Sequence, residues 1–510
     1  MDDSSDLQSA TLTQSETFEP ENTPDVGKAA RQGGFWAIVS YAFAKATGFA
    51  SSIVLARLLL PHDYGLIGMV NTVLAAAAVV GNLGIGAALV HQREDVEEYA
   101  NTMWWLDILF GVFLFALANL LSPIAAAYYH EPRVRWLILA ASTNFLINPI
   151  GGAMGALLRR DLRFKTVQAV AMIQSCASSL LAIVFAVLGA GVWSFIYPYI
   201  LANLMQAVFL WRLCPFRPKL KVRWNLARRL ISFGKNLAGA SVFLYINENV
   251  DYMLVGALMG GVKLGFYVFA YNLGVWIVQN VWGPISAIVF PTFSAVQHDP
   301  CRAQSMFLKL LALVAAIGFP IIAVQWALAP LYIGALYGTK WLDSVVAFRF
   351  IALYGMVRAV CSPALSLIAA MGRPDVNFKL NAAACPVLVT AIFIGSRHGI
   401  NGVAAATAIA HGIFTWLWLA VPFRILKWDI RDAISAVAPA AACSALTGLI
   451  AWTGYCALGK SVTSVVLLLE IVALSALVYI GLGMTVFRRS YAPIFETVRA
   501  VMRDVREKVA

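Results

Sequence analysis

The stretch FWAIVSYAFAKATGFASSIVLARLL, residues 35–59, is almost entirely apolar, and its only charged side chains are those of Lys45 and Arg57. A helix needs about 20 consecutive, mostly apolar residues to cross the hydrocarbon core of a bilayer. The stretch therefore predicts a membrane-spanning helix. About fourteen such stretches cover the chain, and further clear examples are residues 64–90, 103–128, 167–188 and 465–487.

The composition agrees with a chain that lies largely in a membrane. Of the 510 residues, 60% are hydrophobic and 13% are charged, and the mean hydropathy is +0.76. Soluble domains have about 45–50% apolar and about 25% charged residues. The alternating segments of about ten residues that build a membrane β-barrel are not found in the sequence. We therefore predict an all-α polytopic membrane protein with about 14 transmembrane helices.

The net charge of +12 comes from basic residues that gather between the spans. If the N-terminus is cytoplasmic, about 27 of the 38 Lys and Arg residues fall on the cytoplasmic side and about 6 on the other. Cytoplasmic loops carry such an excess of Lys and Arg. We therefore expect both termini in the cytoplasm, an even number of spans, contacts between basic loops and anionic lipids, and no nucleic-acid partner.

The two ends of the chain differ from the spans. Residues 1–32 are polar and acidic, unlike a signal peptide, and predict a disordered cytoplasmic tail. Residues 489–510 have apolar positions three to four residues apart with basic residues between them, which predicts an amphipathic helix. Such a helix lies on the anionic inner leaflet, or alternatively it is exposed to water.

The two halves of the chain match each other at a fixed offset. At an offset of 200 residues, VLARL at 54–58 aligns with LVGAL at 254–258, and Gly65 aligns with Gly265. Further on, RRDLRFK at 159–165 aligns with RPDVNFK at 373–379. Six spans in each half give parallel repeats, an architecture of alternating-access transporters that hold their substrate between two lobes.

The repeat predicts two pseudo-symmetric six-helix lobes followed by two additional C-terminal helices, which fall outside the repeat. The expected parts are the N-terminal tail 1–32, the N-lobe 33–213, a basic cytoplasmic linker 214–230, the C-lobe 231–425, the last two spans 426–488 and the C-terminal tail 489–510.

No residue pattern predicts a catalytic centre, a metal site or a cofactor. The seven cysteines are scattered without a CxxC pair, and the six histidines form no HExxH or similar cluster. A membrane enzyme such as a polymerase or glycosyltransferase would need a sizeable extramembrane loop and paired carboxylates, which the short loops do not offer. We therefore do not expect an enzyme.

One motif carries a family resemblance. ARLLLP at 56–61, followed by DYGL at 63–66, resembles the start of a Wzx-type polysaccharide flippase, a family within the multidrug/oligosaccharidyl-lipid/polysaccharide exporter superfamily. LGIGAALV at 83–90, RRDLRFK at 159–165 and GRP at 372–374 fit the same family pattern. The resemblance extends from about Gly33 to about Arg424 and is lost in the last two spans.

The resemblance implies a V of two six-helix lobes in the bacterial inner membrane. It implies a flippase that moves an undecaprenyl-pyrophosphate-linked oligosaccharide from the inner to the outer leaflet, for exopolysaccharide, capsule or O-antigen assembly. The polysaccharide polymerase and the export machinery are the protein partners of such a role. Alternatives with the same fold are a lipid-linked peptidoglycan precursor flippase and a drug or metabolite antiporter.

Charged residues inside spans are costly and usually face protein or water, so they mark candidate sites. Lys45 and Arg358 lie near the middle of their spans, and Arg57 lies near an outer end. We expect these three cations to bind the pyrophosphate and acidic sugars. Glu248 and Asp251, in the seventh span, either bind a coupling proton or sodium ion or form a salt bridge between the lobes.

The repeat also places these charges relative to one another. At the offset of 200, Glu248 corresponds to Gly48, which lies on the same helical face as Lys45. We therefore expect Lys45 of one lobe to face the carboxylates of the other. A cation without an acid in the first span also favours an anionic cargo over the cationic substrates of a drug antiporter. Four mid-span amides either contact sugar hydroxyls or join helices by hydrogen bonds; they are Asn203, Gln206, Gln279 and Asn280.

Overall fold

In the computed structural model, the described residues are 26–81, 96–161, 163–219, 223–295, 299–371, 373–457 and 465–485. They form helices joined by short connections, with no strand among them. Ten of the described segments are long and apolar enough to cross a membrane. The prediction of an all-α polytopic membrane protein is therefore confirmed, whereas the number of about fourteen spans stays a prediction. Most of the acidic tail, the motif at 83–90 and the predicted helix at 489–510 lie outside the described residues.

The first half of the chain forms a group of helices that we call the first bundle. Its helices are α1 (Val26–Leu58), α2 (Pro61–Gly81), α4 (Val96–Tyr128), α5 (Arg133–Ser142), α6 (Asn144–Arg160), α7 (Phe164–Val187) and α8 (Trp193–Leu213). α1 packs on α7, α7 on α8, and α4 on α5 and α6. Since α1 begins at Val26, the last residues of the predicted tail 1–32 belong to this helix.

The second half forms the second bundle and two further helices. The second bundle contains α9 (Trp224–Ala295), α10 (Pro300–Ala327), α11 (Ala329–Tyr337), the short η1 (Thr339–Ser344), α12 (Val345–Ala370), α13 (Pro374–Ser396) and α14 (Gly399–Leu426). The two further helices are α15 (Ile430–Ala457) and α16 (Val465–Thr485). α12 packs on α9 and α14, and α15 packs on α10 and α16.

α9 consists of two helices joined at Gly260, where φ is 79° and ψ is 176°. Glycine adopts such a positive φ without the steric cost that a side chain would add. The kink falls 200 residues after Leu60, which separates α1 from α2. The two parts of α9, residues 224–259 and 261–295, therefore correspond to α1 and α2, in agreement with the offset of the repeat.

The bundles meet where α2 packs along the second part of α9. A Cβ atom added to Gly65 would overlap the carbonyl group of Gly261, and one added to Gly265 would overlap that of Pro61. These two glycines occupy equivalent positions of the repeat and let the two backbones touch. The contact lies near the end of the molecule at which α1 ends and α2 begins.

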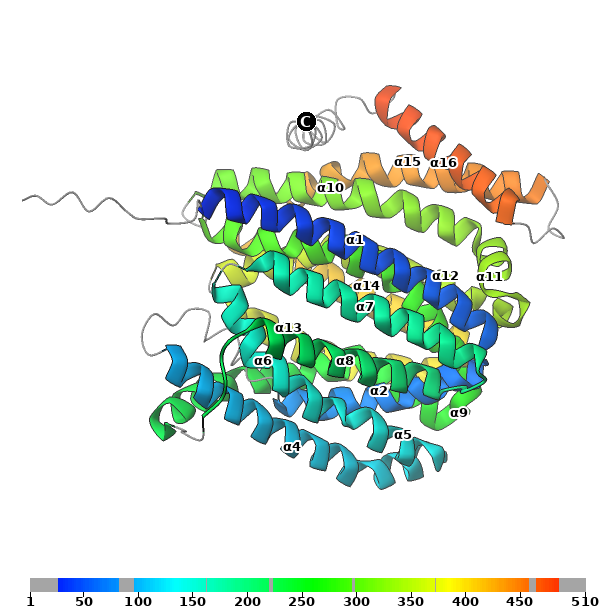
Figure 1. The fold of residues 1–510 in the computed structure, drawn as a ribbon. Coiled ribbons are helices and arrows are strands. Elements are labelled where there is room, and N and C mark those ends of the chain that lie inside the picture. The colour runs from blue at the N-terminus through cyan, green and yellow to red at the C-terminus, as the bar shows by residue number, and fades with distance from the viewer. Residues whose placement is uncertain are drawn as a thin grey trace, which may run out of the picture.

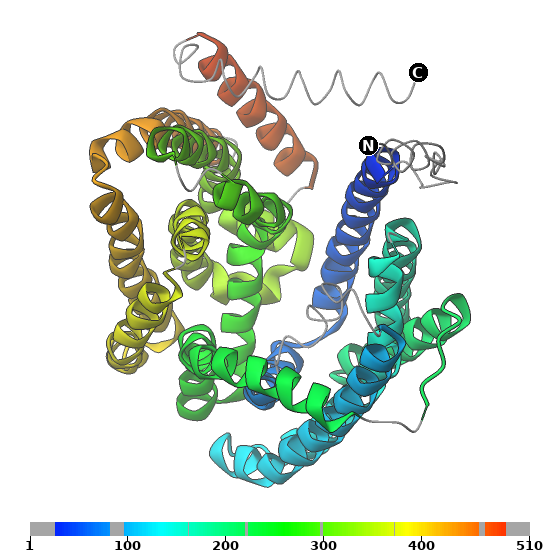
Figure 2. The ribbon, with the colours of Figure 1, turned by 90° about the vertical axis from the view of Figure 1, so that its left-hand side faces the viewer.

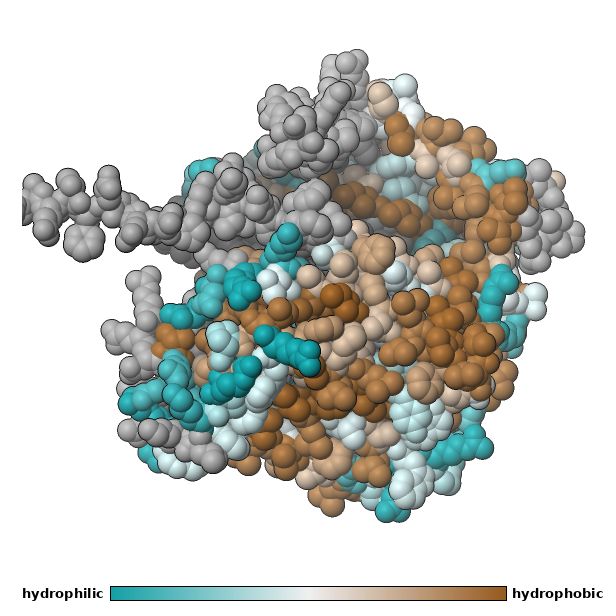
Figure 3. Space-filling model, in the orientation of Figure 1, coloured by the Kyte–Doolittle hydropathy of each residue, from teal (hydrophilic) through white to brown (hydrophobic). Residues whose placement is uncertain are grey.

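The overall arrangement suits a bilayer. Figure 1 shows most helices running along one direction, with α15 and α16 at one edge beside α10. In Figure 2, seen from the end at which α1 begins, the first bundle lies on one side and α10 to α15 lie on the other. The face drawn in Figure 3 is mostly apolar across its middle, with hydrophilic residues toward the two ends of the helices. Large apolar side chains such as those of Leu120, Leu180 and Leu477 are exposed, which fits contact with lipid.

Candidate functional site

An ion pair in the second bundle joins two of the predicted site residues. Nη2 of Arg358, on α12, lies 2.7 Å from Oε1 of Glu248, on the first part of α9. Nη1 of Arg358 donates a hydrogen bond of 2.6 Å to the hydroxyl of Tyr354, one turn earlier on α12. The two side chains of the ion pair are 40% and 42% exposed, so a ligand can reach both charges.

The ion pair lies beside the interface between the bundles. Tyr245, one turn before Glu248 on α9, donates a hydrogen bond of 3.0 Å to the carbonyl oxygen of Thr72 on α2. Residues three apart lie on the same side of a helix. Glu248 is therefore next to the side of α9 that contacts the first bundle. Its ion pair is formed within the second bundle and not with a cation of the first, so it does not join the lobes in this conformation.

Lys45 lies on the side of α1 that faces the second bundle. Tyr41 and Phe49 stand four residues before and after it, on the same side of the helix. The hydroxyl of Tyr41 is 3.3 Å from Oδ1 of Asn280, and the ring of Phe49 is 5.5 Å from that of Trp276, both on α9. The exposed ammonium group of Lys45 lies 5.3 Å from the centre of the Tyr41 ring. Within the described part of the chain, no ion pair links Lys45 to Glu248 or Asp251.

Asp251 has a different environment from Glu248, although the two lie one turn apart. Its side chain is buried inside the second bundle. Oδ2 accepts a hydrogen bond of 2.8 Å from the hydroxyl of Tyr267, and Oδ1 accepts one of 2.9 Å from the backbone N–H of Tyr252. These partners are neutral. A buried carboxylate with neutral partners is a candidate for binding a proton or a metal cation.

Two residues of α14 complete the polar interior of the second bundle, and sequence reasoning missed both. Oγ1 of Thr407 lies 3.3 Å from the hydroxyl of Tyr267, which bonds Asp251. The ring of His411, one turn further along α14, lies 4.5 Å from the ring of Tyr354. A spacing of four residues, Thr407 to His411, is the one signal in the sequence that places both on one face of a helix.

Arg57 joins the two bundles through hydrogen bonds. Its Nε donates 2.8 Å to the carbonyl oxygen of Leu336, and its Nη2 donates 2.5 Å to that of Ala335. These carbonyls belong to the last turn of α11, where backbone acceptors lack partners within the helix and a cation is favoured. In this conformation the predicted phosphate ligand Arg57 therefore binds the end of a helix.

The second bundle in turn donates hydrogen bonds to the end of a helix of the first bundle. Nζ of Lys340, in η1, donates 2.9 Å to the carbonyl oxygen of Arg57 and 2.6 Å to that of Leu59, at the end of α1. The indole N–H of the fully buried Trp341 donates 2.8 Å to the carbonyl oxygen of Ala56. Burial lowers the pKa of Lys340 below its ordinary value, and the charge of Asp63 opposes this. We call these reciprocal contacts of Arg57, Lys340 and Trp341 the seal.

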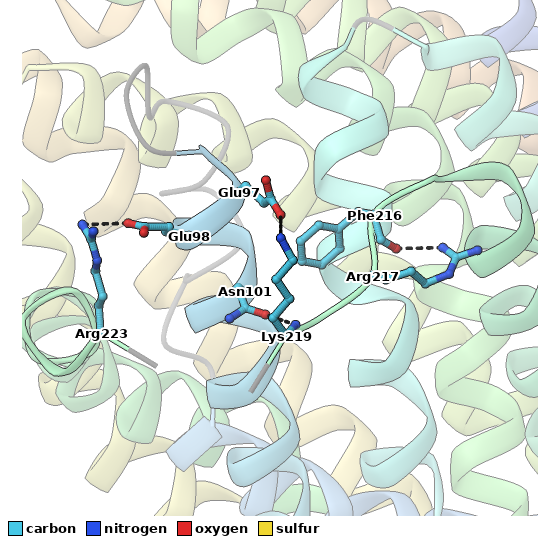
Figure 4. A pocket seen from close by; sticks show the side chains of 7 residues that line it. All are labelled: Glu97, Glu98, Asn101, Phe216, Arg217, Lys219 and Arg223. Atoms are coloured by element: carbon cyan, nitrogen blue, oxygen red, sulfur yellow. Dashed lines mark hydrogen bonds and ion pairs between the residues drawn. The ribbon is translucent and has the colours of Figure 1, made fainter. Parts of the chain in front are cut away.

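The opposite end of the molecule holds a second set of charged contacts, drawn in Figure 4. The segment that leads to the second bundle is bound there to the start of α4. Nζ of Lys219 lies 2.6 Å from Oε1 of Glu97, and Nη1 of Arg223 lies 2.7 Å from Oε2 of Glu98. The backbone N–H of Lys219 also donates 2.6 Å to Oδ1 of Asn101. The hydrogen bond to Glu97 and its charge raise the pKa of Lys219 above its ordinary value. A pocket of about 220 Å³ lies among these side chains.

Two of the four mid-span amides, Asn203 and Asn280, are engaged between helices. Nδ2 of Asn203, on α8, donates 2.8 Å to Oδ1 of Asn144, on α6. Nε2 of Gln174, on α7, donates 3.1 Å to Oδ1 of Asn203. Asn280 is bonded to Tyr41 of the first bundle, as described above. These contacts agree with the alternative that these amides join helices.

Solved structures with the same fold are membrane transporters. The lipid II flippase MurJ in an inward closed conformation superposes with a TM-score of 0.70, over 89% of this chain and 99% of that one, at 14% sequence identity. At this identity the likeness shows the fold alone.

The sequence comparisons establish the family. A family model described as "Polysaccharide biosynthesis protein" matches residues 54–346, and the chain belongs to this family. The lipopolysaccharide biosynthesis protein WzxC of Escherichia coli (strain K12) is 25% identical over 371 residues, which cover 72% of this chain and 75% of WzxC. The succinoglycan biosynthesis transport protein ExoT of Rhizobium meliloti (strain 1021) is 24% identical over 366 residues, 70% of this chain and 72% of ExoT.

These findings confirm the resemblance to Wzx-type polysaccharide flippases that residues 56–66 indicated. The protein is a multi-pass membrane protein of polysaccharide biosynthesis with a transporter fold.

Proposed function

We propose that the protein is a flippase that moves a polyprenyl-pyrophosphate-linked oligosaccharide repeat unit from the inner to the outer leaflet by alternating access. The cargo serves exopolysaccharide, capsule or O-antigen assembly. The observation that carries the proposal is the accessible guanidinium group of Arg358 beside the interface of the bundles. Such a group suits a pyrophosphate, because its planar fork of donors matches phosphate oxygens.

Lys45 adds a second positive charge on the other side of the same interface. It is exposed on the face of α1 that contacts α9. A pyrophosphate that enters between the bundles can therefore meet a cation from each of them. This arrangement favours an anionic cargo over the cationic substrates of a drug antiporter. The oligosaccharide would occupy the space between the bundles, while the prenyl tail stays in the lipid.

The seal supports alternating access. Arg57, Lys340 and Trp341 join the bundles at the end where α1 ends. With the N-terminus in the cytoplasm, as the distribution of Lys and Arg predicts, this end faces outward. The described conformation would then be closed to the outside. Release of the glycan outside would require the seal to break.

Asp251 is the candidate for coupling transport to an ion gradient. Its buried carboxylate has only neutral hydrogen-bond partners among the described residues, Tyr267 and the backbone of Tyr252. Uptake of a proton or of Na⁺ at Asp251 would neutralise its charge inside the second bundle. Helix α9 carries both Asp251 and Glu248, so ion uptake and cargo binding act on one helix.

The prenyl tail, the surrounding lipids and other proteins of polysaccharide assembly would make further contacts with the protein. An apolar groove of about 420 Å³, lined by residues of α10, α11 and α16 such as Ile321, Tyr332 and Leu469, provides a surface for the prenyl tail. Anionic lipids would bind the basic cytoplasmic loops and the C-terminal tail. The polymerase and export machinery would receive the glycan on the outer side of the bacterial inner membrane.

A lipid-linked peptidoglycan precursor flippase is the second candidate, and the fold of MurJ favours it. Its cargo carries the same pyrophosphate group, so Arg358 and Lys45 would serve both. The matching family and the relatives WzxC and ExoT bear names of polysaccharide biosynthesis. We therefore place surface polysaccharide first.

Deletion of the gene tests the proposal. We expect loss of the surface polysaccharide, with the full-length repeat unit left on its lipid carrier at the inner leaflet. Wild-type protein should restore the polymer, and Arg358→Gln should not. Arg135→Gln is the matched control, because Arg135 is exposed at the end of the helices that carries the seal. Incomplete lipid-linked sugars would point to a glycosyltransferase, and unchanged polysaccharide with altered drug tolerance would point to an antiporter.

A further inference from the structure

Arg358 is already bound to an anion of the protein itself. Its Nη2 lies 2.7 Å from Glu248, and its Nη1 is bonded to the hydroxyl of Tyr354 at 2.6 Å. A phosphate group can bind this guanidinium only in competition with the Glu248 carboxylate. Both side chains are about two-fifths exposed, so the competition takes place where a ligand has access.

We infer that Glu248 is a selectivity residue that protects Arg358 from the singly charged phosphodiester headgroups of anionic phospholipids and allows a pyrophosphate to bind it. This inference rests on the proposed function. A site that opens to a bilayer meets phosphodiesters in large excess over any lipid-linked sugar. A cation without a protecting anion would be occupied by them.

The charges explain the selectivity. A phosphodiester carries one negative charge, as the Glu248 carboxylate does, so an exchange replaces one such partner by another and leaves Glu248 unpaired. A pyrophosphate carries a charge on each phosphate group and has more acceptor oxygens. The extra charge-assisted hydrogen bonds favour the exchange. Displacement of Glu248 from Arg358 therefore requires a ligand with more than one negative charge.

The neighbours of the ion pair fit this role. Tyr354 holds Nη1 of Arg358, so the guanidinium group keeps its position on α12 when Glu248 leaves. The ring of His411 lies against Tyr354 on the side of α14. Asp251 is engaged with Tyr267 and the backbone of Tyr252, and does not replace Glu248 as a partner. Glu248 is therefore the acid of α9 that can exchange with a ligand.

The test measures binding of undecaprenyl pyrophosphate to the purified full-length protein in nanodiscs. The nanodiscs contain either phosphatidylcholine alone, whose phosphodiester is neutralised by its own choline group, or an equal mixture with phosphatidylglycerol, whose phosphodiester carries a net negative charge. The measured quantity is the dissociation constant in the mixture divided by the dissociation constant in phosphatidylcholine alone. Glu470→Gln is the matched control, because Glu470 is an exposed residue of α16 and takes no part in the ion pair.

For the wild type and Glu470→Gln we expect the same small ratio, which reflects the general effect of an anionic bilayer. For Glu248→Gln we expect binding in phosphatidylcholine to become at least about tenfold tighter, and the ratio to rise at least about tenfold, because phosphatidylglycerol now competes. Arg358→Gln should lose binding in both lipids. A thermal unfolding curve verifies that each variant is folded, and Glu248→Asp, which keeps the charge, should stay close to the wild type if Glu248→Gln is unstable.

The outcomes separate the two proposals. If binding depends on Arg358 but Glu248→Gln leaves the affinity and the ratio unchanged, the role of Glu248 is overturned and the cargo site remains. If Arg358→Gln binds the probe as the wild type does, the proposed cargo site is wrong and the inference is overturned with it.

Discussion

Replacement of Lys340 by methionine removes the cation that bonds the end of α1 while keeping an apolar chain of similar length. The ammonium group donates to the carbonyl oxygens of Arg57 and Leu59 at 2.9 and 2.6 Å. A hydrogen bond that involves a charged group contributes about 1.5–3 kcal/mol when it is well shielded from water. The side chain of Lys340 is half-buried, and the burial that lowers its pKa opposes part of the gain. We therefore expect the two bonds together to stabilise the seal by about 1–2 kcal/mol.

A loss of this size changes how often the seal opens. A difference of 1–2 kcal/mol changes an equilibrium constant roughly 5- to 30-fold. Amide hydrogen exchange of residues 52–66 reports this opening, because loss of the contact between the bundles exposes the ends of α1 and α2 to water. In Lys340→Met, exchange of this segment should therefore be roughly 5- to 30-fold faster than in the wild type.

The control and a second variant make the prediction specific. Lys263 is an exposed residue of α9 just past the kink at Gly260 and has no ion pair among the described residues, so Lys263→Met should leave the exchange unchanged. Arg57→Met removes the reciprocal bonds to α11. Because both cations hold one contact, the double variant should exchange less rapidly than the two separate effects predict. Equal exchange in Lys340→Met and Lys263→Met would refute the stabilising role of the seal.

Three further predictions concern other contacts. Gly265→Ala should abolish polysaccharide export in a complementation assay, because the added Cβ would overlap the backbone of Pro61. Gly412→Ala is the control and should not affect export, since there is open space around Gly412. Equal export by both variants would show that the close approach of the helices is dispensable. Asp251→Asn keeps a hydrogen-bonding side chain without the charge, so flipping in proteoliposomes should continue but no longer respond to a proton or sodium gradient, and a retained response would remove Asp251 as the coupling acid. Because the pKa of Lys219 is raised, its ion pair with Glu97 should be present below pH 10.5, the ordinary lysine value, and should be lost only as the pH rises through the higher value. Cleavage of residues 214–219 by subtilisin should increase over the same pH range. Lys219→Met, or about 1 M salt, should expose this segment at neutral pH.

The alignment of the repeat already contained the two glycines at which the bundles meet, although it did not identify them as a contact. Gly65 and Gly265 align at the offset of 200, and in the structure each lies against the backbone of the other helix. The kink at Gly260 follows the same offset. Close packing between two copies of one helix pair requires small residues at these places, so the pattern remains visible in a single sequence.

The partners of the charged residues were not predictable in the same way. The repeat gave the faces of Lys45 and Glu248, and it led to the expectation that they meet between the lobes. In the structure Glu248 pairs with Arg358, because the first part of α9 packs on α12 within one bundle. Hydropathy gives the depth of a residue in the membrane, but it does not give the neighbour of a helix or its rotation.

Arg57 shows a second limit. From the sequence, Arg57 was expected to bind the pyrophosphate near the outer end of its span. The structure instead bonds it to α11, a helix of 9 residues that is too short to stand out in the hydropathy pattern. Gly338, with a φ of 101°, ends this helix. A glycine directly before Thr339 and Lys340 is the signal that could have marked the helix end and its cation.

Helix α1 carries a residue of the proposed cargo site and a residue of the seal, and this gives the molecule a means of coupling them. α1 holds Lys45 at its middle and Arg57 at its end. A ligand shifts a conformational equilibrium only by the difference in its affinity for the two states. Because each bond of the seal contributes on the order of 1 kcal/mol, a pyrophosphate that draws Lys45 toward Arg358 would need only a modest preference for the outward-open state to break the seal. The weakness of the individual contacts is therefore what a carrier requires, since a single strong lock between the bundles would hold it closed with cargo bound.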